Sequence, residues 1–395
     1  MQISLTDKQT TAANPVLVGN SAERLLALDV ARGITMAFMI MVNNNGGPGS
    51  WHFMNHAEWN GLTPTDLVFP TFVFIVGISV VFATQARLAK GASRAELAKH
   101  TVIRAIVLIF LGIIVNTFPF TDLAHIRIYG VLQRIAVCYL VVSLFYLWDQ
   151  RASTKWIALA GCLIGYWVFV RWVPIPGTGM PGRDVPFMDM NQNLVSWLDR
   201  HVFPYLYGHD PCPPDPEGLL SDLPAVGTAL MGVLAGLWLR SKRSVGTKTA
   251  GLALASLSSL VVGYLWSMEF PLNKHVWTSS YVLVAGGYSF ALLAFMHFAI
   301  EQMNWRKGWT WPWLVFGSNA IAAYMFSELL TSLLFNISLT GADGKSTDAM
   351  TWLVTHISAL IPNAQWAAFA YSVSFTAFCF VPVWILYRKR IFLKV

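Results

Sequence analysis

The feature that most constrains this chain is a series of long apolar runs separated by short polar segments. A helix needs roughly 20 apolar residues to cross a hydrocarbon core about 30 Å thick. About ten runs meet this requirement, which predicts an all-α, polytopic membrane protein with about ten transmembrane helices. The predicted spans are residues 25–42, 66–84, 101–117, 129–147, 156–173, 223–239, 248–267, 277–300, 312–336 and 365–387. The stretch from Thr351 to Ile361 is too short to cross and is expected at the interface.

The composition agrees with a membrane protein and argues against other classes. Only 12% of the residues are charged, whereas soluble domains have nearer a quarter. The formal net charge of +7 does not predict a nucleic-acid partner, because the basic residues form short clusters between apolar runs rather than a patch. Cys212 is the one cysteine in a hydrophilic segment, so we expect neither a disulfide nor a metal site.

The positions of the basic residues predict the orientation, because lysine and arginine favour cytoplasmic loops. With both termini inside, only a minority of the basic residues outside the spans face outward: Arg127, Arg171, Arg183, Arg200, Lys274 and Lys345. We therefore predict a cytoplasmic tail at 1–24, one membrane domain at 25–395, and an acidic, proline-rich periplasmic cap at 174–222.

The segment between the first two spans contains a candidate catalytic residue. Thr63, Pro64 and Asp66 have the order of a helix N-cap, a first helical residue and an acidic residue in the first turn. His56 lies just before this helix start and can titrate near neutral pH; alternatively, it is a solvated loop histidine. His52 lies four residues earlier, but the surrounding glycines disfavour the helix that a metal-binding pair would need.

A second group of candidates consists of ionisable residues inside predicted spans, where charges usually face a bundle interior or a watery cavity. Asp29 and Arg32 are three residues apart and either pair structurally or serve function. Arg134 either snorkels outward or faces the interior. The position of Glu328, well inside its span, favours a functional role for this residue. Asn273–Lys274 precedes the eighth span among aromatic residues that an interfacial belt would also explain.

Several segments together resemble the heparan-α-glucosaminide N-acetyltransferase family and its bacterial relatives. The matching segments, in the family's order, are LDVARG (28–33), VNNNGGPGSW (42–51), HAEWNGLTPTDLVFPTFVFIVG (56–77), GVLQR (130–134), DPEGLL (215–220) and PLNKHVW (271–277). The resemblance implies acetyl transfer from cytosolic acetyl-CoA to the amine of a terminal glucosamine across the membrane.

The resemblance also implies the catalytic residues. It assigns the active-site histidine to His56 and a catalytic asparagine to Asn44, although Asn43 or Asn45 can hold the second role. In this hypothesis His56 accepts a proton from the attacking amine and Asn44 donates to the oxyanion. An acetyl-histidine intermediate is the alternative.

The binding residues follow from the same hypothesis. The donor-binding residues are predicted to be Arg32, Arg134 and Asp29, with coenzyme phosphates near the basic clusters at 87–99 and 240–248. The predicted acceptor-binding residues are Asn60, Glu217, Asn273, Lys274 and Glu328.

The expected partners are acetyl-CoA, an amino sugar or glycan and membrane lipid, without a metal; a homodimer remains open. The chain lacks the extra N-terminal lumenal segment of the family's lysosomal members, which favours a bacterial inner membrane. An amino-sugar or N-acetylglucosamine permease is the alternative function. A histidine–asparagine cluster at one membrane face, without an evident pair of broken helices, favours the enzyme.

Overall fold

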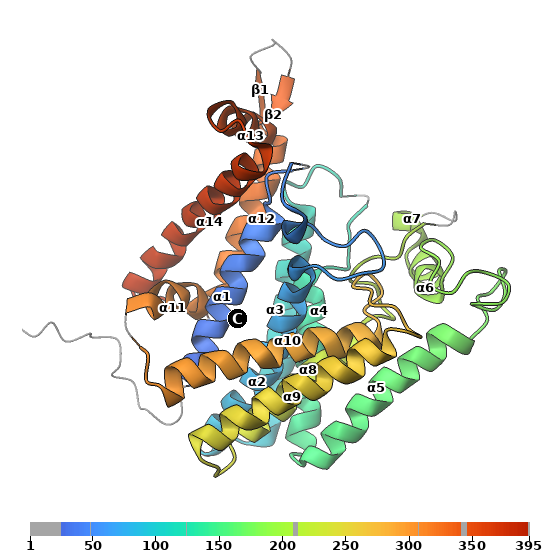
Figure 1. Ribbon diagram of the computed structural model, residues 1–395, viewed down its shortest axis with the longest axis vertical. Helices are drawn as coiled ribbons and strands as arrows, with labels where there is room; N and C mark the ends of the chain where they lie inside the picture. The colour runs from blue at the N-terminus through green and yellow to red at the C-terminus, as the bar shows by residue number, and fades with distance from the viewer. Residues whose placement is uncertain are drawn as a thin grey trace, which may run out of the picture.

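The computed structural model describes residues 25–47, 49–123, 125–207, 212–306, 308–340 and 346–393, so the predicted tail at 1–24 lies outside the described residues. The described chain is a helical bundle with one two-stranded hairpin (Figure 1). Its helices are α1 Leu26–Asn43, α2 Val68–Leu88, α3 Arg94–Thr117, α4 Val131–Trp148, α5 Ala152–Trp172, α6 Leu194–Val202, α7 Pro204–Tyr207, α8 Asp222–Leu239, α9 Val245–Trp266, α10 Ser279–Met296, α11 Trp311–Ser318, α12 Ala320–Asn336, α13 Ala349–Leu360 and α14 Ala364–Arg388.

Shorter elements extend or join these helices. A 3₁₀ turn, Pro64–Leu67, leads into α2, and a π-helix, His297–Gln302, continues α10. The strands β1 Ser338–Thr340 and β2 Ser346–Asp348 pair antiparallel between α12 and α13. Within the described chain, nine helices are long and apolar enough to cross a membrane. The all-α polytopic fold that the apolar runs predict is therefore confirmed.

The spans form an inner and an outer group. The apolar windows of α1, α2, α4, α8 and α10 are 56–78% buried, whereas those of α3, α5, α9 and α14 are 22–28% buried. The outer helices expose large apolar side chains such as Phe110 and Leu254, as helices facing lipid do. Polar and charged side chains within the spans are therefore expected to contact one another between the inner helices.

Glycines permit the close packing of the inner helices. A Cβ atom on Gly77 of α2 would collide with the Ala229 carbonyl of α8, and one on Gly232 of α8 would collide with the Phe74 carbonyl of α2. Small residues allow such close backbone approach between membrane helices. The helix α2, which begins just after His56, is thus fixed against the centre of the bundle.

The helix ends define two opposite faces. The His56 face holds the segments 44–63, 118–130, 173–221 and 267–278, which contact one another through pairs such as Gly61–Leu272 and Arg127–Asp215. The Arg87 face holds the ends of α2 and α4 and the start of α1, joined by contacts such as Gln85–Gln150 and Ala27–Glu301. Both ends of the described chain lie at the Arg87 face. Which face is cytoplasmic stays a prediction.

The ninth predicted span differs from expectation. Gly308–Ser318 and Ala320–Asn336 are bent by 73° at Asn319, so the run 312–336 is a broken helix rather than one straight span. The Asn319 amide donates to the Ile391 carbonyl and accepts from the Leu393 backbone, which satisfies polar groups at the break. Counted as one span, this pair brings the total to ten. A periodicity argument cannot detect such a break, because apolar residues continue through it.

The predicted cap at 174–222 contains two short helices, α6 and α7, that the sequence did not indicate. In Figure 1 they lie together at one side of the molecule, beyond the end of α5. Part of this segment joins α5 and the 267–278 loop in a small second apolar core that includes Tyr166, Met188, Val195 and Phe270. The cap therefore packs against the loop that carries Lys274.

Candidate active site

His56 pairs with a buried carboxylate. Its Nδ1 lies 2.7 Å from Oδ1 of Asp66, which is 1% exposed, whereas the His56 side chain is 43% exposed. Because an ionised carboxylate only accepts hydrogen bonds, the imidazole Nδ1 must carry the hydrogen and donate it. The Nε2 lone pair of neutral His56 is then free to take a proton. This arrangement is that of a general base oriented by a carboxylate.

The local sequence explains why Asp66 holds this position. Thr63 and Asp66 form the capping box of the helix start, which confirms the predicted N-cap. The other carboxylate oxygen, Oδ2, accepts from the backbone N–H groups of Ala57 and Thr63. One side chain therefore closes the 57–66 loop, caps the helix and orients His56.

Lys274 approaches the same imidazole from a distant part of the chain. Its Nζ lies 3.1 Å from Nδ1 and 3.2 Å from Nε2 of His56, and 4.0 Å from Asp66 Oδ1. Burial lowers the pKa of Lys274, while the carboxylates of Asp66 and Glu217 oppose that shift. Two predicted site residues, His56 and Lys274, are therefore in direct contact.

The predicted acceptor residues Asn60 and Asn273 fasten these two loops together. The Asn273 side chain donates to the Asn60 side chain at 3.1 Å and accepts from the Val276 backbone. The Gly61 backbone donates to the Leu272 carbonyl, which adds a second connection. Asn60 is exposed and Asn273 is buried, so only the former presents surface to a ligand.

The two glutamates predicted to bind the acceptor lie in electrostatic range of each other. Glu217 interacts with Lys274 and with Glu328, and its carboxylate also pairs with Arg127 at 2.7 Å. Glu328 of α12 accepts from the Asn43 amide at 3.1 Å. A line of polar groups therefore extends from His56 through Lys274 and Glu217 to Glu328.

The structure does not bring Asn44 into contact with His56. Asn44 is 1% exposed; its amide nitrogen donates to the Ile40 carbonyl and its amide oxygen accepts from Thr331 of α12. Asn45 instead donates to the Met54 carbonyl and the Asn55 side chain, which braces the segment before His56. Asn45 therefore stabilises the loop before His56. Asn43 instead donates to Glu328, a predicted acceptor-binding residue.

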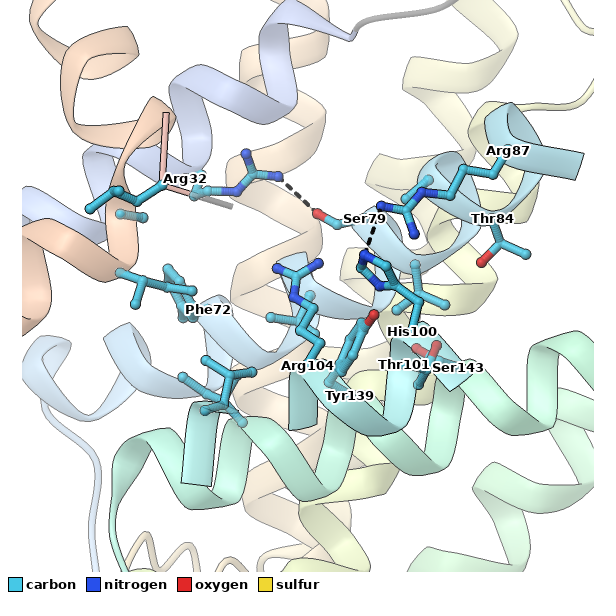
Figure 2. A pocket seen from close by; sticks show the side chains of 18 of the residues that line it. Arg32, Phe72, Ser79, Thr84, Arg87, His100, Thr101, Arg104, Tyr139 and Ser143 are labelled. Carbon is cyan, nitrogen blue, oxygen red and sulfur yellow. Dashed lines mark hydrogen bonds between the residues drawn. The ribbon is translucent and has the colours of Figure 1, made fainter. Parts of the chain in front are cut away.

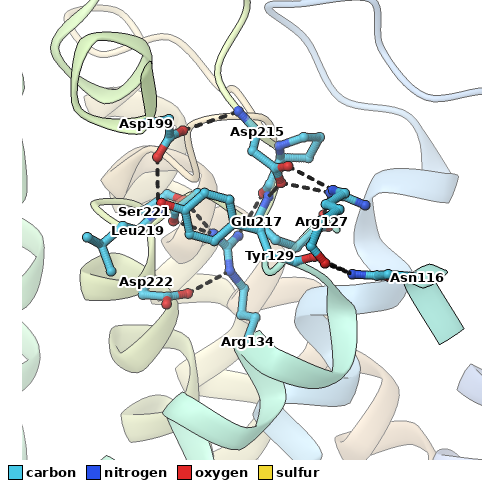
Figure 3. A network of polar contacts seen from close by, with 12 residues as sticks. Asn116, Arg127, Tyr129, Arg134, Asp199, Asp215, Glu217, Leu219, Ser221 and Asp222 are labelled. Atoms are coloured by element: carbon cyan, nitrogen blue, oxygen red, sulfur yellow. Dashed lines mark hydrogen bonds and ion pairs between the residues drawn. The ribbon is translucent and has the colours of Figure 1, made fainter. Parts of the chain in front are cut away.

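Arg134, predicted to bind the donor, is at the His56 face and is separated from Arg32. Its guanidinium pairs with Asp222 and donates to the carbonyls of Pro216 and Gly218 and to the Ser221 hydroxyl (Figure 3). The side chain is 0% exposed, and these contacts fix the segment that carries Glu217. Arg134 therefore shapes the site by holding a loop.

A cavity of about 490 Å³ opens near the Arg87 face. Arg32 lies in its wall, paired with Asp29 and donating to Ser79, and Arg87 contacts His100 (Figure 2). The side chains pointing into this region that carry charge or hydrogen-bonding groups include Arg32, Ser79, Thr84, Arg87, His100, Thr101, Arg104, Tyr139 and Ser143.

Arg104 is suited to an anionic ligand. Its Nε atom is buried without a hydrogen-bond partner among the described residues, while its guanidinium carbon lies 4.8 Å from the centre of the Tyr139 ring. A buried guanidinium donor that the protein leaves unpaired is costly unless a ligand accepts from it. Of the two predicted basic clusters, 87–99 contributes to this cavity, and 240–248 does not appear among its lining residues.

Sequence reasoning missed the orienting role of Asp66 and the cavity residues on α4. Asp66 was assigned only to the helix cap; an acidic residue closing the loop that starts at His56 was the available signal. Tyr139 and Ser143 are common residues of apolar helices, and no sequence signal separates them from packing residues.

Comparison with known proteins identifies relatives of this chain. Residues 24–267 match the family model described as heparan-alpha-glucosaminide N-acetyltransferase, catalytic. The heparan-alpha-glucosaminide N-acetyltransferase of Mus musculus is 28% identical over 99% of this chain and 64% of its own length. That of Homo sapiens is 29% identical over 94% of this chain and 60% of its own length. The chain thus spans less than two thirds of these relatives.

The family model covers more than half of the chain, including His56 and Asp66, and ends before Lys274. This match confirms the resemblance that the motifs indicate. The chain belongs to the heparan-alpha-glucosaminide N-acetyltransferase catalytic family.

Proposed function

We propose that this protein is a transmembrane acetyltransferase that moves an acetyl group from acetyl-CoA to the amine of a glucosamine-type sugar. The observation that carries the proposal is the pairing of exposed His56 with buried Asp66 at one face. The basic cavity near the opposite face supports it, because a donor and an acceptor that arrive from different compartments need separate entrances. The names of the mouse and human relatives suggest the amino sugar.

His56 acts as the general base in this proposal. The amine nitrogen of the sugar attacks the thioester carbonyl, and its proton passes to Nε2 of His56. Asp66 keeps the imidazole in the required tautomer and stabilises the imidazolium that forms. The carbon–sulfur bond then breaks, and the thiolate takes the proton from the His56 imidazolium and leaves as free coenzyme A, which restores neutral His56. Asn44 stays in the proposal as a donor to the oxyanion, through the amide hydrogen that Ile40 does not accept.

The polar groups between Lys274 and Glu328 are proposed to bind the acceptor. Glu217 and Glu328 supply carboxylates for sugar hydroxyls and for the ammonium form of the amine, and exposed Asn60 supplies an amide. Arg134 and Arg127 hold the segment that presents Glu217. The acceptor is therefore recognised by hydrogen bonds at the His56 face, under the cap.

The basic cavity is proposed to bind the coenzyme phosphates. Arg32, Arg87 and Arg104 line this cavity, and no aspartate or glutamate appears among its lining residues. Arg32 pairs with Asp29, which lies outside the lining. A small hollow nearby is lined by Met36, Phe72 and Tyr324, among other residues. Phe72 lies in the walls of both spaces.

The proposal also places the protein in a bacterial inner membrane, with the His56 face outside and the Arg87 face in the cytoplasm. With a single cysteine introduced at exposed Glu58 in a cysteine-free background, an impermeant maleimide should label intact spheroplasts. The matched cysteine at exposed Lys90, on the Arg87 face, should need permeabilisation. The reverse pattern would invert the topology and place the donor cavity outside.

Transfer of a labelled acetyl group is the test of the activity. Purified protein should move label from acetyl-CoA to glucosamine, with a weaker reaction on amino sugars whose amine is shifted or blocked. Broken helices such as α11–α12 also occur in permeases, but a permease has no use for acetyl-CoA. Sugar uptake into proteoliposomes without acetylation, together with absent acetyl-CoA binding, would replace the enzyme by the permease.

A further inference from the structure

Lys274 occupies an unusual position relative to His56. Its Nζ is nearly equidistant from the two imidazole nitrogens, at 3.1 and 3.2 Å. A point in the ring plane at these two distances would overlap the carbon between the nitrogens. The ammonium therefore lies over the face of the ring, and it leaves the in-plane lone pair of Nε2 open to a substrate amine.

The position of Lys274 is fixed by its neighbours. The Asn273 backbone donates to the Thr278 hydroxyl, and the Lys274 carbonyl accepts from the Trp277 backbone. Trp277 is fully buried, and the Lys274 side chain is only 15% exposed. A cation held this way needs little reorganisation when charge develops beside it.

We propose that Lys274 is a catalytic residue whose ammonium stabilises the oxyanion of the tetrahedral intermediate. The inference rests on the proposed function. A reacting nitrogen that gives its proton to Nε2 must approach that atom to about 3 Å, and Nζ is already 3.2 Å from the same atom. The oxygen that becomes negative is bonded to the carbon under attack, so it forms within reach of the lysine hydrogens.

The negative charge that forms on oxygen needs a hydrogen-bond donor or a positive charge beside it. As the new carbon–nitrogen bond forms, the carbonyl electron pair moves to oxygen, and it returns when the carbon–sulfur bond breaks. Asn44 makes no contact with His56, and its bond to the Ile40 carbonyl leaves only one of its amide hydrogens, so a donor beside His56 is still needed. Lys274 is the positively charged group in contact with His56 in the described chain, and it has three hydrogens to donate.

Charged groups around Lys274 set its behaviour with pH. Asp66 and Glu217 favour its protonated form, whereas Arg134 and burial disfavour it. The rings of His56 and His275 lie nearby; burial lowers the pKa of His275, and the positive charge of Lys274 adds to this shift. Removal of the lysine charge at alkaline pH should therefore end oxyanion stabilisation, whereas an arginine would keep its charge.

The test compares Lys274→Met and Lys274→Arg with wild type in the acetyl-transfer assay. We expect Lys274→Met to lower kcat by about 10²-fold or more, as loss of an oxyanion donor does, with acetyl-CoA affinity within about threefold of wild type. Lys274→Arg should recover part of the loss, and its activity should extend to higher pH than that of wild type. Arg183→Met removes an exposed charge from the same face of the protein and should behave as wild type.

Three outcomes would overturn the role of Lys274. These are near-normal turnover of Lys274→Met, equal losses in folded Lys274→Met and Lys274→Arg, or an alkaline limit that Lys274→Arg leaves unmoved. If Lys274→Met fails to fold, the pH profile of Lys274→Arg decides alone. A wild-type protein that binds acetyl-CoA yet transfers nothing to any amine would instead refute the proposed function.

Discussion

The two faces of the bundle both contain charged side chains, but these side chains have different partners. At the His56 face, charges are paired within the protein: His56 with Asp66, Arg127 with Asp215 and Glu217. At the Arg87 face, the lining of a cavity of about 490 Å³ contains arginines and no carboxylate, and among these arginines Arg32 pairs with Asp29 outside the lining. A site for chemistry needs fixed groups, whereas a site for a soluble polyanion needs charges left available.

Arg134 and Arg104 illustrate the contrast within one residue type. Arg134 uses its guanidinium on Asp222, on two loop carbonyls and on the Ser221 hydroxyl, and its side chain is 0% exposed. Arg104 keeps a buried Nε without a partner among the described residues. The difference cannot be read from the sequence, since both are arginines within apolar helices. It arises from the loop 215–222, which packs over Arg134 and not over Arg104.

The largest expected effect is loss of the base at the His56 face. His56→Ala should lower acetyl transfer by at least about 10²-fold, because no other described group accepts the amine proton at that position. Acetyl-CoA binding should persist, since the basic cavity lies near the opposite face. His52→Ala changes an exposed histidine four residues away and is the matched control. Equal activity of the two variants would mean that His56 is not the base and that the His56 face is not shown to perform the chemistry.

A smaller effect is expected from the carboxylate that orients this base. Asp66→Asn should reduce kcat by roughly 10- to 100-fold, because an amide can stabilise the wrong imidazole tautomer and cannot stabilise the imidazolium. Asp66 also caps a helix, so Thr63→Ala serves as the control: it weakens the same cap, by about 1 kcal/mol, and leaves the His56–Asp66 pair. A kcat for Asp66→Asn that matches that of Thr63→Ala would reduce Asp66 to a structural residue.

His56 and Asp66 also show which features of the site the sequence can predict. Apolar runs predict nearly all the spans, because burial in lipid demands about 20 apolar residues wherever a helix crosses. The capping pattern at Thr63 and Asp66 predicts the helix start for a similarly local reason. The contact between His56 and Lys274 joins positions 218 apart and depends on the packing of two loops. The motifs HAEWNGLTPTDLVFPTFVFIVG and PLNKHVW suggested the two residues separately, and only the fold places one beside the other.

The Arg87 face should respond through affinity rather than turnover. Arg87→Ala and Arg104→Ala should each weaken acetyl-CoA binding by about tenfold and make the remaining affinity less dependent on salt, because fewer charge pairs are left to be screened. Turnover at saturating donor should change little. Arg94→Ala removes an exposed arginine at the same face that does not line the cavity. An equal loss in all three variants would mean that general surface charge, and not the cavity, attracts the coenzyme.

The smallest effect on turnover is expected from Asp199, which lies in α6 of the cap and is 1% exposed. Burial raises the pKa of Asp199 from 3.8 to about 7, and the nearby charge of Asp215 adds to the shift. Its carboxylate accepts from the backbone N–H groups of Asp215 and Leu219, and so holds the cap to the segment that presents Glu217.

The sign of the pH effect follows from this shift. The docked cap binds the Asp199 proton more tightly than an opened cap, so docking is most favourable in acid. It should weaken as pH rises from about 4 to about 7, by at most tenfold per pH unit, and then stay constant. Hydrogen exchange of the 194–202 backbone amides should follow this course in wild type. In Asp199→Asn, whose side chain cannot ionise, the pH dependence beyond the intrinsic exchange rate should disappear. If the pH dependence persists in Asp199→Asn, the titrating group lies elsewhere in the cap, and another carboxylate controls the docking of the cap.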